Sequence, residues 1–171
     1  MIYHITPFSE TKQYGKALNE HIKCFPDDSW ICVRDQDTMF LTSTSVLLLD
    51  KAIEDNPDCQ LFTCATNRSY GSLMSTNADI LVSCSKAQEL EKQPPRYSVL
   101  QGVVPAFLWL FPKSLWKKYP FDDLPIISGQ KSFDVRWTRN MNVKKLRIEN
   151  LYIFHLYRLY KERSDYSHLQ K

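Results

Sequence analysis

Glycine, net charge and long apolar runs are all scarce in this sequence, and each scarcity excludes a class of protein. Four glycines among 171 residues leave no glycine-rich loop for nucleotide phosphates early in the chain. Lys and Arg total 22 against 19 acidic residues, and a net charge of +3 is too small to indicate a dedicated nucleic-acid binder. The longest apolar run, residues 103–111, contains Pro105 and falls short of the roughly 20 residues that a membrane helix needs. We therefore expect no nucleic-acid partner and no transmembrane segment.

Paired cysteine motifs are also missing. None of the five cysteines forms a C-x-x-C pair, and Cys59 and Cys64 lack two further ligands at zinc spacing, so no structural zinc site is expected. The odd count favours reduced thiols and a cytoplasmic location. The first residues contain no basic stretch followed by an apolar run, and no secretory signal is expected. With 43% hydrophobic residues, the chain has the composition of a folded domain.

Strand-like apolar runs and helical periodicities alternate in the first part of the chain. The expected elements are a buried strand at 2–5, a helix at 14–25, a strand at 30–33, a helix that begins at Ser43 or Ser45, and a strand at 61–65. Such alternation is typical of an α/β fold in which a mostly parallel sheet lies between two layers of helices. We therefore predict a three-layer α/β/α architecture.

The second half of the chain has weaker patterns. Residues 66–97 are polar and predict a loop region with at most one short helix near 87–92. The remaining expected elements are a strand at 103–111, a short helix opened by Pro112, a helix at 133–142, and strands at 146–148 and 151–154. We expect one domain over residues 1–159 and a polar tail over residues 160–171.

Two acidic residues follow the second expected strand. Asp35 and Asp37 end the segment WICVRDQD, and alternate residues of an extended chain point the same way, so their carboxylates can converge on one hard cation. A divalent ion there can bridge the phosphates of a nucleotide. A D-x-D pattern alone is weak, because a solvated turn gives the same letters. The apolar residues 39–41 directly after the pair favour a site over such a turn.

This segment resembles the D-x-D strand of the GT-A-type glycosyltransferases, in particular their family 2-like group. Residues 14–19, YGKALN, are similar to the family's helix beside the nucleotide. Residues 101–116, QGVVPAFLWLFPKSLW, resemble its small-residue turn, apolar strand and short helix, and residues 120–123, PFDD, resemble its G-F-D-E element. The similar segments span nearly the whole chain in the family's order. The resemblance implies a GT-A-like, Rossmann-like fold.

The resemblance also implies a metal site and a donor. Asp37 and His155, in LYIFHLYR, would bind Mn²⁺ or Mg²⁺, and Asp35 would touch the ribose or a metal-bound water and complete the acidic site. The donor would be a nucleoside diphosphate sugar, with Arg158 near its diphosphate. A histidine on an apolar strand is otherwise a hydrogen-bonded structural residue, and Arg158 is otherwise a solvated side chain.

Asp134 is the candidate general base. It lies in SFDVRWTR, where members of the family place an acid at the start of a helix, and a carboxylate suits the role because it can accept the proton of an attacking hydroxyl. This chain has Phe133 where the family has a first acid. The alternative role for Asp134 is an ordinary interaction with the helix dipole.

Further nucleotide contacts are expected from two segments. Thr6, Pro7 and Phe8 end the first strand where the family places the nucleobase, with Phe8 as a candidate to pack on the base. Lys16 and Asn19, on the first helix, are candidate nucleotide contacts or ordinary helix-surface residues. A strand that reads the nucleobase in the family is missing before residue 30, so recognition of the base is in question.

The sequence and the resemblance thus predict a metal-dependent glycosyltransferase that moves a sugar to an acceptor hydroxyl. Asp134 would be the base of an inverting transfer, and retention is left open because it depends on the geometry of the acceptor. The acceptor is left open as a glycan, a lipid-linked molecule or another hydroxyl compound, and a peripheral membrane contact is open as well. The absence of Q-x-x-R-W argues against a polymer synthase. The alternatives are a nucleotide-sugar binding protein with reduced catalysis and a metal-dependent nucleotidyltransferase.

Overall fold

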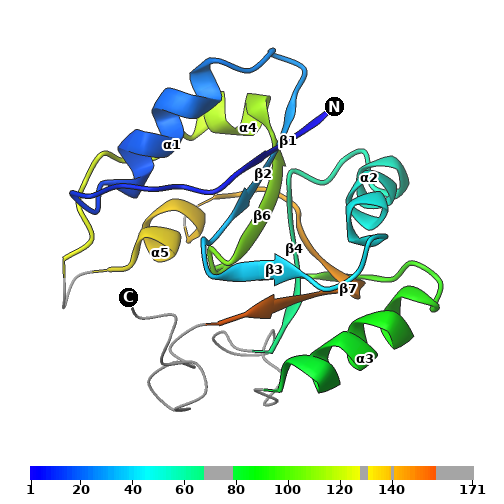
Figure 1. The fold of residues 1–171 in the computed structure, drawn as a ribbon. Coiled ribbons are helices and arrows are strands. Elements are labelled where there is room, and N and C mark those ends of the chain that lie inside the picture. The colour runs from blue at the N-terminus through cyan, green and yellow to red at the C-terminus, as the bar shows by residue number, and fades with distance from the viewer. Residues whose placement is uncertain (68–78, 128–130, 140, 157–171) are drawn as a thin grey trace.

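A computed structural model describes residues 1–67, 79–127, 131–139 and 141–156 (Figure 1). Within these ranges the elements are β1 (Ile2–Ile5), α1 (Tyr14–Lys23), β2 (Trp30–Arg34), β3 (Thr38–Phe40), α2 (Ser45–Asp55), β4 (Leu61–Thr66), α3 (Ile80–Glu91), β5 (Tyr97–Val99), β6 (Leu108–Pro112), α4 (Lys113–Lys118), α5 (Phe133–Thr138) and β7 (Lys145–His155). The expected tail at 160–171 and Arg158 lie outside the described residues. No helix in the described ranges has the length and apolar character needed to span a membrane.

The strands form one mixed sheet in the order β1-β2-β6-β4-β7-β3, with β5 also paired to β7. The pairs β1–β2 and β4–β7 are parallel, as the alternation of strands and helices predicts. The pairs of β6 with β2 and β4, and of β7 with β3 and β5, are antiparallel. Four strands therefore share one direction, and β3, β5 and β6 oppose it.

Helices cover both faces of the sheet. Ile31 and Val33 of β2 point into a core formed with α1, α4 and α5, whereas Cys32 points into a second core that contains Leu49 and Ala52 of α2. This alternation is the period-2 pattern of a strand buried on both faces. The structure thus confirms the expected sheet between two layers of helices.

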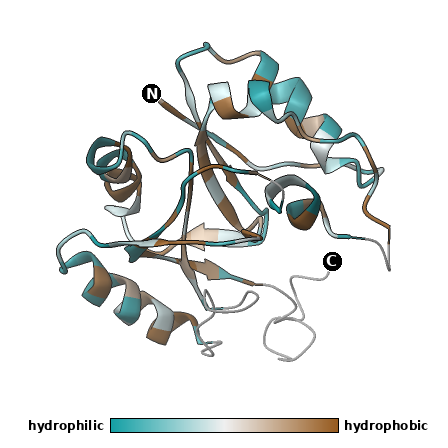
Figure 2. Cartoon of the chain, turned by 180° about the vertical axis from the view of Figure 1, so that it is seen from behind, coloured by the Kyte–Doolittle hydropathy of each residue, from teal (hydrophilic) through white to brown (hydrophobic). Residues whose placement is uncertain are grey.

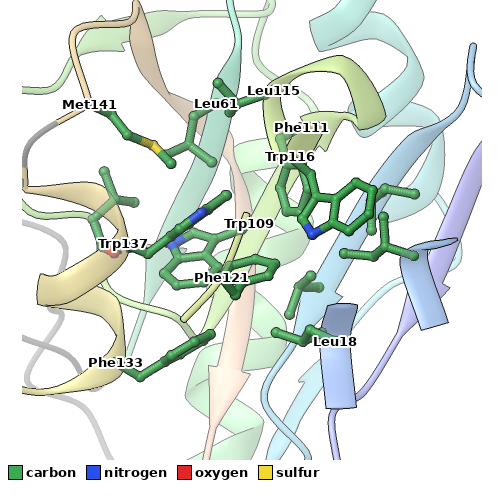
Figure 3. Close-up of a cluster of buried hydrophobic side chains, with 14 residues drawn as sticks. Leu18, Leu61, Trp109, Phe111, Leu115, Trp116, Phe121, Phe133, Trp137 and Met141 are labelled. Atoms are coloured by element: carbon green, nitrogen blue, oxygen red, sulfur yellow. Dashed lines mark hydrogen bonds between the residues drawn. The ribbon is translucent and has the colours of Figure 1, made fainter. Parts of the chain in front are cut away.

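Aromatic side chains fill the core under α1, α4 and α5 (Figure 3). The ring of Trp109, on β6, lies 4.6 Å from that of Trp137 and 5.7 Å from that of Phe133, both on α5. The buried Trp109 and Trp137 indoles each have a hydrogen-bond acceptor, the carbonyl oxygens of Val104 at 3.1 Å and Tyr119 at 2.8 Å. Since a buried N–H without a partner is costly, these bonds hold α5 and the loop before β6 against the sheet.

Helix α1 packs closely on the segment after α4. Its buried residues Gly15, Leu18 and Ile22 recur at helical spacing. A Cβ atom added to Gly15 would lie 1.8 Å from the backbone oxygen of Asp122, so only glycine allows this approach. The segment that contains Asp122 is thereby held against the start of α1.

Three expectations about strands need correction. The strand at residues 2–5 is not buried: β1 is an edge strand whose residues are half-buried or exposed, because only β2 pairs with it among the described strands. The strand expected over 103–111 begins only at Leu108. The two closing strands are one strand, β7, because the polar pair at residues 149–150 fits within a register shift in which Cys64 pairs with Ile148 and Ala65 with Tyr152.

Two expectations about helices also change. The short helix near 87–92 is the end of α3, which begins at Ile80, where Asp79 accepts hydrogen bonds from the amides of Leu81 and Val82. Figure 2 shows hydrophobic and hydrophilic residues mixed around α3, and this mixing hides its helical period in the sequence. The helix expected to reach residue 142 ends at Thr138, whose carbonyl oxygen accepts a bond from the Lys145 ammonium at 2.6 Å.

Candidate metal centre

A tight turn after β2 places the two acidic residues. The backbone amide and hydroxyl of Thr38 both donate to the carbonyl oxygen of Asp35, at 3.1 and 2.7 Å. Thr38 then opens β3 opposite His155 of β7, and the amide of Leu156 donates to the Asp37 carbonyl oxygen at 2.8 Å. The turn and the end of β7 are thus joined by main-chain hydrogen bonds, and the three expected metal ligands meet at one end of the sheet.

The side chains of these residues converge. The His155 Nε2 atom lies 3.2 Å from an Asp37 carboxylate oxygen and 3.9 Å from an Asp35 carboxylate oxygen. One ligand atom from each of the three residues lies within 4.8 Å of the others. Two carboxylates and an imidazole are donors that suit a divalent cation such as Mn²⁺. His155 is buried, whereas the side chains of Asp35 and Asp37 are 39% and 40% exposed, so the site opens to solvent on its acidic side.

Negative charge accumulates at this place. Partial burial raises the pKa of Asp35 above its usual value; His155 opposes the shift, and Asp37 and Asp134 add to it. A carboxyl group whose charge is disfavoured by burial and by neighbouring carboxylates is one that a bound cation would relieve. Asp134, on α5, is thus a further acid whose charge acts on Asp35. The donor set and its excess negative charge therefore fit a divalent metal ion.

The side chain of Asn67 bonds the backbone of His155, a role that the sequence did not predict. Its side-chain amide donates to the His155 carbonyl oxygen at 3.1 Å, and its side-chain oxygen accepts from the His155 amide at 2.6 Å. Asn67 is fully buried and directly follows β4, whose last pair joins Thr66 to Ile153. The side chain thus continues the hydrogen-bond ladder where the backbone of β4 ends. An Asn after an apolar strand is too common to reveal this role from sequence.

Asp134 lies in the first turn of α5, as the sequence predicts. Its side chain is half-buried. Its Oδ1 atom accepts hydrogen bonds from the Ser132 hydroxyl and, at 2.8 Å, from the Val135 amide. Phe133, which takes the place of a further acid, is buried in the aromatic core. The described structure therefore offers one carboxylate at this position, oriented through a single oxygen.

The expected nucleotide contacts differ in how they are placed. Thr6, Pro7 and Phe8 leave β1 at the edge of the sheet where Asp35 leaves β2, because the two strands run parallel with Ile5 opposite Val33. Phe8 is 69% exposed. Lys16 is also exposed, on α1.

Asn19 serves the fold. Its oxygen accepts from the Trp116 indole at 2.8 Å and from the Phe121 amide at 3.3 Å, and its amide donates to the Phe121 carbonyl oxygen at 2.9 Å and to Asp123 at 3.1 Å. All four hydrogen-bonding positions of the side chain are occupied. Asn19 thus fastens the segment after α4 to α1 and offers no free group to a ligand in this conformation.

The structure therefore brings together Asp35, Asp37 and His155, places residues 6–8 at the same edge of the sheet, and uses Asn19 internally. Asp134, on α5, acts on the charge of Asp35 but is not one of the three clustered residues. Comparison with known proteins adds no relative: no protein-family model matches the chain, and no curated protein matches it significantly in sequence. Any function must accordingly be argued from the chain's own residues.

Proposed function

We propose that the chain is a compact GT-A-like glycosyltransferase that transfers a sugar from a nucleoside diphosphate sugar to an acceptor hydroxyl with the help of a divalent cation. One observation carries the proposal. Asp35 and Asp37 at the end of β2, and His155 at the end of β7, have ligand atoms within 4.8 Å of one another. These are the residues that the resemblance to the glycosyltransferases singles out, and they come from opposite ends of the chain.

Main-chain hydrogen bonds hold the turn that carries the candidate metal ligands Asp35 and Asp37. Asp35, Asp37 and His155 would hold the cation, which when bound neutralises negative charge on a diphosphate leaving group. Asn67 bonds the backbone of His155, and the His155 ring lies 6.1 Å from the Phe107 ring. The imidazole would therefore need little reorganisation to bind a cation. The open, acidic side of the site leaves room for a phosphate ligand.

Asp134 would act as the general base. Both of its hydrogen bonds fall on Oδ1, and the other oxygen can accept the proton of an acceptor hydroxyl as that hydroxyl attacks the anomeric carbon. The base would come from α5 and the leaving-group ligands from the strands, and inversion would require them to act on opposite faces of the anomeric carbon. The proton ends on Asp134 and the nucleoside diphosphate departs.

The test is a thermal-shift titration of the full chain with UDP or GDP in the presence and absence of Mn²⁺. A ligand at 100 times its dissociation constant stabilises a protein by about 2.7 kcal/mol. We expect a metal-dependent shift in the wild type that is lost in Asp37→Ala and kept in Asp28→Ala, which removes an exposed carboxylate outside the site. A wild type that shows no metal-dependent shift with any nucleoside diphosphate contradicts the proposal.

A nucleotide-sugar binding protein without turnover is the second candidate. It is favoured by the internal use of Asn19, which removes one nucleotide contact, and by Phe133 in the place of an acid. Release of nucleoside diphosphate from a panel of nucleotide sugars separates the two. The enzyme would release it, and Asp134→Asn would abolish release while keeping metal-dependent donor binding; the binding protein would release none in either form.

A further inference from the structure

A buried lysine closes the end of α5, the short helix that carries Asp134. The Lys145 side chain is buried, and its ammonium donates to the carbonyl oxygen of Thr138 at 2.6 Å and to that of Gly102 at 2.8 Å. Thr138 is the last residue of α5, and a cation at a helix C-terminus satisfies carbonyl groups that have no partner within the helix. No carboxylate pairs with Lys145 among the described residues, so these two oxygens are the partners of its charge.

The hydroxyl of Thr138 connects the same helix end to the backbone of Asp134. It donates to the Asp134 carbonyl oxygen at 2.7 Å and accepts from the Val104 amide at 2.9 Å. Thr138 is fully buried. Helix α5 has six residues, too few to be stable by itself, so its position depends on tertiary contacts such as these. Lys145 and Thr138 thus fasten the end of α5 to residues 102–104.

The segment held by these bonds leads directly to the candidate metal centre. Residues 102–104 are followed by Pro105, whose ring restricts the chain, and two residues later by Phe107. The carbonyl oxygen of Phe107 accepts a bond from the Asp35 amide at 3.3 Å, and its ring lies 6.1 Å from the His155 ring. A continuous set of contacts therefore joins the end of α5 to two of the three candidate metal ligands.

Apolar packing holds the other side of α5. Phe133 and Trp137 point from this helix into the aromatic core around Trp109 (Figure 3). Burial of these rings keeps α5 on the sheet, but the hydrophobic effect is not directional and does not by itself fix the helix along its axis. Hydrogen bonds are directional, and those to Thr138 are among the bonds that set this position.

We propose that Lys145 is a positioning residue of the candidate active site: through Thr138 it sets the place of α5, and hence of Asp134, relative to the metal ligands. It rests on the transferase function proposed above. The ammonium of Lys145 bonds main-chain oxygens, so its effect on Asp134 is indirect. A displacement of about 1 Å can lower the rate of a catalysed reaction 100-fold. Loss of this lysine should therefore affect turnover more than binding of the donor.

The first test is hydrogen exchange of the full chain, followed by mass spectrometry over residues 133–139. Lys145→Met keeps an unbranched side chain and removes the charge. We expect it to raise exchange of the α5 amides about tenfold or more above any change in β6, because hydrogen bonds to charged groups are among the stronger ones. Exchange can be measured whether or not the chain transfers a sugar.

Lys113→Met is the matched control. Lys113 is likewise buried, and its ammonium also donates to two carbonyl oxygens at the end of a helix, those of Lys23 and Phe25 after α1. The amide of Lys113 bonds the carbonyl oxygen of Ser29, just before β2, whereas Asp35 follows β2 at its other end. The control should therefore lose a similar contact and leave exchange over α5 unchanged.

The second test separates turnover from binding. Release of nucleoside diphosphate from a panel of UDP- and GDP-sugars with Mn²⁺ gives kcat and the donor KM. We expect Lys145→Met to lower kcat about 10–100-fold and to change the donor KM by less than about twofold. Thr138→Val removes the hydroxyl and should lower kcat as well, whereas Thr138→Ser keeps it and should restore most of the turnover. Lys113→Met should keep the kcat of the wild type.

The outcomes are distinct. The proposal is overturned if Lys145→Met and Lys113→Met change α5 exchange or kcat alike, or if Lys145→Met keeps the wild-type kcat. A wild type that releases no nucleoside diphosphate contradicts the transferase and with it the catalytic role of Lys145; raised exchange would then leave this lysine an anchor of α5 alone. Circular dichroism and the unfolding temperature check that each variant is folded, and the two Thr138 variants carry the same test if Lys145→Met is not.

Discussion

Replacement of Asn67 by alanine should weaken the fold and the metal centre together. The substitution removes the side chain that bonds both the amide and the carbonyl oxygen of His155, at 2.6 and 3.1 Å. Both groups are buried, and Asn67 itself is fully buried. The printed pairing of β4 with β7 ends at Thr66 and Ile153, two residues before His155, and Asn67 extends it by these two side-chain bonds. The end of β7 would therefore lose its anchor on the β4 side.

The size of the effect follows from these two bonds. A typical hydrogen bond contributes about 1 kcal/mol net, and a buried group left without a partner costs about 1–3 kcal/mol. Water can enter the space left by the side chain and satisfy part of the loss, so we expect a free-energy change of about 2–4 kcal/mol for unfolding. A displaced histidine should also weaken metal binding, by roughly 10–100-fold for a residue that orients a ligand.

Urea unfolding and calorimetric titration with Mn²⁺ measure the two effects separately. Asn56→Ala is the matched control, because its side-chain amide donates one bond of 3.2 Å to Ala52 at the end of α2, far along the chain from the metal ligands. It should cost about 1 kcal/mol and leave Mn²⁺ affinity unchanged. Asn67→Asp keeps the acceptor for the His155 amide and should fall between the wild type and Asn67→Ala. The reasoning is refuted if Asn67→Ala loses no more stability than Asn56→Ala, or if it binds Mn²⁺ as the wild type does.

The remaining predictions concern glycine and cysteine. Gly15→Ala should lower the free energy of unfolding by about 3 kcal/mol, because the new Cβ would lie 1.8 Å from a backbone oxygen. Gly102→Ala, with φ of +75° but no atom within 4 Å of the new Cβ, should lose only about 1 kcal/mol; equal losses in urea unfolding would contradict this account. Burial raises the pKa of Cys32 to about 12 and that of Cys59 to about 11. Because these lie above the unfolded value of about 8.5, stability should be full below that pH and fall as pH rises toward the folded values, which urea midpoints at pH 7.5 and 10 can test. In native protein, iodoacetamide should modify the exposed Cys24 and spare Cys32; similar rates for the two would refute the burial.

Local patterns in the sequence predict the elements that carry their own periodicity. Helix α1 is amphipathic, with Leu18 and Ile22 buried, and β2 is a short apolar run, so both are predicted nearly to the residue. Helix α3 is hidden because Ser83 is buried while Leu81 and Val82 are exposed, which reverses the usual polarity of the two faces. Strand β3 has three residues, and among the described strands it pairs only with the end of β7. Its existence depends on a pairing that no local pattern reveals.

The candidate site divides in the same way. Asp35 and Asp37 can be predicted from the strand that precedes them, whereas His155 and Asp134 are predicted only from the proposed resemblance to the glycosyltransferases. Asn67 could not be found, because its role rests on two hydrogen bonds to a residue 88 positions away. The mixed strand directions of the sheet could not be predicted for the same reason, because they depend on which strands far apart in the sequence pair with one another.

The position of His155 at the end of β7 would link a metal ion at the candidate centre to the folding reaction. β7 pairs with β4 along one edge and with β3 and β5 along the other, so the strand that delivers the histidine is also the strand that closes this half of the sheet. An intermediate that lacks β7 contains the two carboxylates but no third ligand. Binding energy from a cation is then gained only by the completed sheet, and it should retard global unfolding more than local opening of the turn around Asp35. Occupancy of the centre would therefore report that the whole chain has reached its native topology.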